Sequence, residues 1–67
     1  MLANIEAERG RKGLTKEAVS KELDVTSKTY NGYLYGTPIP STILVKMADL
    51  FGCTTDYLLG RTEVRNR

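Results

Sequence analysis

The stretch LTKEAVSKELDVTSKTYNGYLYG, residues 14–36, contains two helical patterns separated by about three residues. In the first pattern, Thr15 is a good N-cap, because its hydroxyl can accept a hydrogen bond from an amide that the helix leaves unpaired. Val19 and Leu23 lie four residues apart and give this helix one apolar face. The first half of the stretch therefore predicts a helix over about residues 16–23.

The second pattern begins at Thr26, which can cap a helix in the same way. Its apolar positions, spaced i, i+3 and i+4, are Tyr30, Tyr33 and Leu34. Asp24 stands in the connection between the two patterns, where a left-handed backbone is expected and glycine fits best. The second half of the stretch predicts a helix over about residues 27–35, which ends at Gly36.

Two helices joined by so short a connection have the sequence shape of a helix-turn-helix. The connection holds the second helix across the first, so that its N-terminal turn projects and can enter a DNA major groove ~12 Å wide. With the apolar stripe turned inward, the exposed positions are Ser27, Lys28 and Asn31. Lys28 can donate to guanine, Asn31 can pair with adenine through two hydrogen bonds, and Ser27 can donate or accept. These three residues are the predicted base-reading set.

Five further residues stand at helix starts or in the following loop, where hydroxyls and backbone amides commonly hold phosphates. They are Thr15, Lys16, Thr26, Tyr35 and Thr37. For Tyr35 two interpretations remain open, a phosphate contact through its hydroxyl and an exposed aromatic side chain without a role. The net charge of the chain is only +2, but no acidic residue occurs between Thr26 and Met47. That window is free of carboxylates that would repel phosphate.

The rest of the chain contains three more helical patterns and no strand pattern. Apolar spacing and glycine stops predict helices over about residues 2–12 and 41–51. A last short helix is capped by Thr54 or Thr55 and ends at Gly60. We therefore expect an all-α fold, a compact domain of five helices.

This domain is predicted to occupy residues 1–60. Residues 61–67, RTEVRNR, show no helical period and are expected to form a flexible basic tail. The arginines of the tail, expected to be solvated, are Arg61, Arg65 and Arg67.

The composition excludes several classes of protein. One cysteine and no histidine exclude an internal disulfide and a Cys/His zinc site. No paired carboxylates fall on one predicted face, so we expect no enzyme, no cofactor and no small-molecule substrate. Cys53 is expected to be a small buried hydrophobic residue. The longest fully apolar run, Ile43 to Val45, is far shorter than the ~20 residues that cross a bilayer, and we expect a soluble cytoplasmic protein.

Two stretches, GLTKEAVSKELDVTSKTYNGYLYG and PIPSTILVKMADLFGCTTDYLLGR, together resemble the Cro/CI-type (XRE) helix-turn-helix family, particularly its small phage-like repressors. The resemblance extends over residues 5–61. It implies a lambda-repressor-like domain of five helices that binds double-stranded DNA and regulates transcription in a bacterial cell. It also implies a homodimer on an operator with two-fold symmetry.

The resemblance places Lys16 where the family often has a glutamine that binds phosphate, and it places Ser27 and Lys28 at the principal base-reading positions. Gly32 falls where another base-reading residue often stands, so direct base contacts should be fewer than usual. Asp24 replaces the usual turn glycine, which implies modest strain.

The first helix departs from the family pattern as well. Leu34 replaces a frequent glutamate that pairs with an arginine from the first helix, here Arg9, and Glu8 stands where an apolar residue is common. We expect Arg9 to pair with Glu6 or Glu8 instead, or to face solvent or phosphate.

Two alternatives to a phage-type repressor remain open. The chain is compatible with an antitoxin or restriction-modification controller that binds its own promoter, and with a protein-interaction module that has lost DNA binding. The expected dimer surface lies on the last two helices, around Leu50, Phe51, Tyr57, Leu58 and Leu59.

Overall fold

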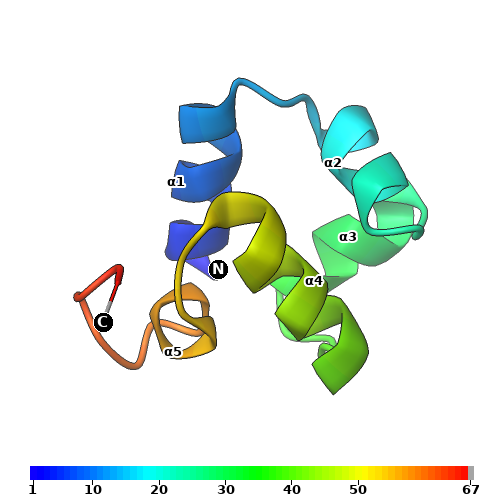
Figure 1. Cartoon of the computed structure of the whole chain (residues 1–67). Coiled ribbons are helices and arrows are strands. Elements are labelled where there is room, and N and C mark those ends of the chain that lie inside the picture. The colour runs from blue at the N-terminus through cyan, green and yellow to red at the C-terminus, as the bar shows by residue number, and fades with distance from the viewer. Residues whose placement is uncertain (67) are drawn as a thin grey trace.

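The computed structural model describes residues 1–66 and is helical throughout, with no strand in that range. Its elements are α1 (Ala3–Lys12), α2 (Lys16–Glu22), α3 (Ser27–Leu34), α4 (Ser41–Phe51) and α5 (Thr55–Leu58). The predicted all-α fold of five helices is confirmed (Figure 1). None of the helices within residues 1–66 combines the length and apolar character that a bilayer span requires.

The ends of the helices lie where the local sequence predicts them. The Thr15 and Thr26 hydroxyls accept from the third amide of α2 and α3, at 3.0 and 3.1 Å. Of the two candidate caps for α5, Thr54 takes the role and accepts from the Tyr57 amide at 3.1 Å. Asp24 has φ 58° and is the one non-glycine residue with positive φ within residues 1–66, so the expected left-handed turn is present.

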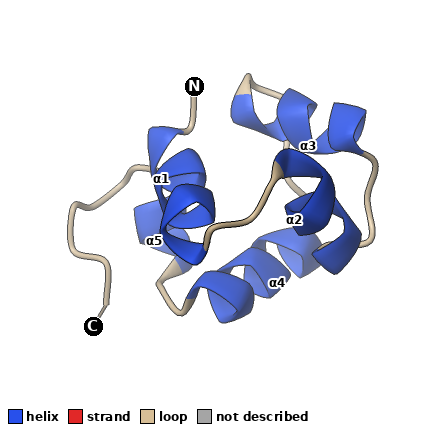
Figure 2. Cartoon of the chain, turned by 90° about the horizontal axis from the view of Figure 1, so that it is seen from above, coloured by secondary structure: helices blue, strands red, loops and turns tan. Residues whose placement is uncertain are grey.

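Four of the helices form two groups, and α4 runs along one edge of both. Helix α2 packs against α3, while α1 packs against α4 and α5. Figure 1 shows α1 and α5 on one side of the molecule and α2 and α3 on the other, and the view from above in Figure 2 shows α4 running along one edge of both groups. This arrangement leaves one side of the α2–α3 pair free of other helices.

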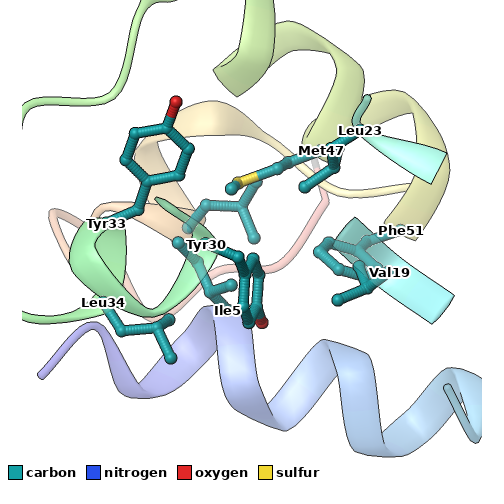
Figure 3. Close-up of a cluster of buried hydrophobic side chains, with 9 residues drawn as sticks. Ile5, Val19, Leu23, Tyr30, Tyr33, Leu34, Met47 and Phe51 are labelled. Atoms are coloured by element: carbon teal, nitrogen blue, oxygen red, sulfur yellow. The ribbon is translucent and has the colours of Figure 1, made fainter. Parts of the chain in front are cut away.

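The core lies between these groups and takes side chains from all five helices. The buried hydrophobic residues are Ile5, Val19, Leu23, Tyr30, Tyr33, Leu34, Met47, Phe51 and Leu58. In Figure 3 the Tyr30 ring stands in the middle of this cluster, between Ile5 and the side chains of Val19 and Phe51. The predicted inner face of α3 is therefore confirmed, because all three of its stripe residues are buried.

The prediction that Arg65 is solvated is wrong. Its guanidinium donates from Nε and Nη2 to the Glu8 carboxylate at 2.9 and 2.8 Å, and from Nη2 to the Phe51 carbonyl at 2.6 Å. The physical reason is Glu8, whose side chain in α1 is fully buried and needs a cation. Arg61 does remain exposed, and Arg67 lies outside the described residues.

Candidate nucleic-acid interface

The two faces of α3 differ in the way that DNA recognition requires. Ser27, Lys28 and Asn31 are exposed, whereas Tyr30 and Leu34 are fully buried. At ~100° per residue, the three exposed side chains fall within about a third of the helix circumference, beside the buried stripe. The structure therefore brings the three predicted base-reading residues onto one accessible surface.

A contact between α2 and α3 joins a predicted phosphate-binding residue to a predicted base-reading residue. The Lys16 ammonium donates to Asn31 Oδ1 at 3.2 Å. Pairing with adenine through two hydrogen bonds requires the oxygen of the asparagine amide as well as its nitrogen. In this conformation Oδ1 already accepts one hydrogen bond, so a bond from adenine has to use its second lone pair or take the place of Lys16.

The capping threonines of α2 and α3 differ in what they can still donate. The Thr15 oxygen accepts from the Ala18 amide, which leaves its hydroxyl proton free for a phosphate. The Thr26 hydroxyl accepts from the Thr29 amide and also donates to Thr29 Oγ1 at 2.9 Å. A phosphate contact from Thr26 would have to replace that second bond, whereas the exposed Thr29 keeps a free hydroxyl proton.

Thr29 is a further candidate for a phosphate contact, and the helical periodicity does not identify it. The signal that could have found it is a second hydroxyl residue three positions after a threonine N-cap, where the two side chains meet.

The end of α3 and the loop after it present the remaining candidates. Tyr35 is 65% exposed and Thr37 is also exposed, so both side chains are accessible to a ligand. The amide of Thr37 donates to the Gly32 carbonyl at 3.0 Å, which fixes the start of the loop against the last turn of α3.

A polar network beneath α3 ties its inner face to α1. The Tyr30 hydroxyl donates to Glu6 Oε2 at 2.7 Å, and Arg9 donates to both Glu6 oxygens at 2.9 and 3.0 Å. Arg9 also donates to the Leu14 carbonyl at 2.7 Å. The hypothesis that Arg9 finds a carboxylate within its own helix is thus confirmed, with Glu6 rather than Glu8 as its partner.

The network changes the pKa of its members. The hydrogen bonds from Arg9 lower the pKa of Glu6 below its ordinary value, despite an opposing effect of burial. Burial raises the pKa of Tyr30 far above that of a solvated tyrosine, and the Glu6 carboxylate adds to the shift. At neutral pH the network therefore holds an ionised Glu6 and a protonated Tyr30.

Part of the dimer surface expected on the last two helices is buried in the core. Phe51 and Leu58 are 1% and 0% exposed, so neither can contact a second copy. Leu59 is 37% exposed. It lines a groove of about 380 Å³ between α5 and the loop after α3, and Met1 and Leu2 lie in the same groove.

Comparison with known protein families supports this description of the site. The model of a family described as Helix-turn-helix matches residues 5–58, which is most of the chain. No curated protein and no solved structure matches the chain.

Proposed function

The chain belongs to the Cro/CI-type (XRE) helix-turn-helix family of DNA-binding transcription regulators, and from this premise we propose that it is a phage- or prophage-type repressor. In this proposal it binds a specific operator in double-stranded DNA as a homodimer, in the bacterial cytoplasm. Each copy inserts the N-terminal part of α3 into the major groove.

The observation that best supports this proposal is the exposed polar face of α3. The buried side chains of the same helix fix it against the core. Lys28 and Asn31 lie one turn apart on the exposed face, within reach of neighbouring base pairs. Each well-formed contact between such a side chain and a base edge discriminates by ~1–3 kcal/mol against the wrong base. Tyr30, bonded to Glu6 behind this face, holds the helix in place while those contacts form.

Contacts to phosphate would set the position of the domain on the duplex. We assign them to Thr15, Lys16 and Tyr35, with Thr26 contributing through the start of α3 rather than through its occupied hydroxyl. Each neutralised phosphate steepens the dependence of log K on log salt by ~0.9. Lysine contacts should therefore be visible in a salt titration.

Three base-reading residues discriminate too little for one domain to find a single site in a genome. Two copies on half-sites ~34 Å apart would double the number of base contacts. Of the expected surface, Leu59 is exposed and Leu50 and Tyr57 are partly exposed. In this proposal these residues and the groove with Met1 and Leu2 face the second copy.

Selection of bound duplexes from a random library tests the proposal. We expect a consensus of two half-sites related by a two-fold axis. A single half-site without symmetry would contradict the dimer. No enrichment at all would contradict the repressor and favour a protein-interaction module.

A further inference from the structure

The outer face of α3 contains a gap at Gly32. Lys28 and Gly32 are four residues apart, so they are direct neighbours on the helix surface. Both lie on the face opposite the buried Tyr30 and Leu34. A side chain at position 32 would continue the row of base-reading residues, and glycine has none.

The loop after α3 fills this gap. A Cβ atom built on Gly32 would lie 3.1 Å from Thr37 Oγ1 and 3.7 Å from Thr37 Cβ. The backbone holds the threonine there, because the Thr37 amide donates to the Gly32 carbonyl at 3.0 Å. Thr37 is nevertheless an exposed residue, and its hydroxyl lies next to Gly32.

We propose that Thr37 supplies, from the loop, the base-contacting group that position 32 lacks, and that it determines the preferred base at one base pair in each half-site. The inference rests on the proposed function. A threonine hydroxyl can donate to or accept from a base edge in the major groove. Gly32 contributes to this assignment, because even the Cβ of an alanine there would lie 3.1 Å from Thr37 Oγ1, and Thr37 would have to shift by a few tenths of an ångström.

A contact from Thr37 to phosphate, the simpler expectation, predicts a different outcome. Phosphates are the same at every base pair, so losing such a contact weakens binding to all sequences about equally. Losing a base contact instead removes preference at one position of the site. The two roles can therefore be separated without a structure of the complex.

The test is duplex selection with four variants of the full chain. Thr37→Val keeps the shape of the side chain and removes the hydroxyl, Thr37→Ser keeps the hydroxyl, and Gly32→Ala displaces Thr37. Thr55→Val, on α5 and outside the proposed DNA-contacting residues, is the matched control. Thermal melting of each variant checks folding. Ala is the better helix former, so Gly32→Ala should not unfold α3.

We expect Thr37→Val to lose about five- to tenfold preference at one base pair per half-site, the size of one neutral hydrogen bond. Gly32→Ala should change the preference at the same base pair, while Thr37→Ser and Thr55→Val retain the native consensus. Equal loss on selected and random duplexes in Thr37→Val, or an unchanged consensus, would overturn the assignment of Thr37. If the native chain itself enriches no sequence, the proposed function fails and this inference fails with it.

Discussion

Replacing Tyr30 by phenylalanine tests whether the network under α3 stabilises the fold as its geometry indicates. Tyr30→Phe keeps the fully buried ring and removes only the hydroxyl, which donates to Glu6 Oε2 at 2.7 Å. Glu6 keeps both hydrogen bonds from Arg9, so no charge is left buried without a partner. The variant therefore isolates one hydrogen bond to a charged acceptor.

The expected loss follows from the surroundings of that bond. Hydrogen bonds to charged groups contribute ~1.5–3 kcal/mol to stability. The Glu6 side chain is 18% exposed and retains Arg9, which places the loss at the lower end, ~1.5 kcal/mol. For a domain of this size, 1 kcal/mol lowers the melting temperature by ~4–8 °C, so Tyr30→Phe should melt about 6–12 °C below the native chain.

The assay is urea unfolding followed by circular dichroism, with Tyr35→Phe as the matched control. Tyr35 is 65% exposed, and its hydroxyl should matter by less than ~0.5 kcal/mol. In a Glu6→Gln background the cost of Tyr30→Phe should shrink, because the acceptor is no longer charged. A loss at neutral pH no larger than that of Tyr35→Phe, or an undiminished loss in the Glu6→Gln background, would refute the reasoning.

Three further perturbations have definite expected outcomes. Asp24→Gly should raise the free energy of unfolding by up to ~1 kcal/mol, because φ is 58° at this position, and a clear decrease in urea unfolding would show that the aspartate side chain stabilises the turn. The Arg65 hydrogen bonds hold the pKa of Glu8 below its ordinary 4.5. The ionised Glu8 therefore contributes to the stability of the fold above pH 4.5, and this stabilisation is lost as pH falls through the lower folded-state pKa. Glu8→Gln should accordingly flatten the fall in stability between about pH 5 and pH 3, and an unchanged slope would contradict the ion pair. Lys16→Ala should reduce the salt dependence of DNA binding by ~0.9 in log–log slope, and an equal slope would remove Lys16 from the phosphate contacts.

The sequence was sufficient to predict the helices because their ends are decided locally. Threonine caps and glycine stops act within one turn of the chain, and the observed bounds of α2, α3 and α4 differ from the predicted ones by at most one residue. The inner face of α3 could be predicted as well, since its period of i, i+3 and i+4 leaves one orientation that buries both Tyr30 and Leu34.

The contacts that the sequence did not predict join residues far apart in the chain. Arg65 and Glu8 are 57 positions apart, and nothing in the aperiodic tail indicates which of its arginines returns to α1. The one signal was Glu8 itself, a carboxylate at a position where the family commonly has an apolar residue. The bond from Lys16 to Asn31 likewise depends on the packing of α2 against α3, which periodicity does not specify.

Two residues of the expected dimer surface are buried for a related reason. Apolar residues at the end of a helix can serve the core or a partner, and the sequence does not distinguish the two uses. Only the packing showed that Phe51 and Leu58 are buried in the core and that Leu59 is exposed.

The central claim, that the outer face of α3 reads bases, is tested most directly by one ratio, the affinity for the selected duplex divided by the affinity for random duplex. It should be measured for the native chain, for Lys28→Ala, and for Lys46→Ala, which removes the same charge from an exposed position on α4. We predict that Lys28→Ala lowers the ratio by the equivalent of ~1–3 kcal/mol and that Lys46→Ala leaves it unchanged. A Lys28→Ala variant that binds both duplexes more weakly by the same factor would contradict the claim.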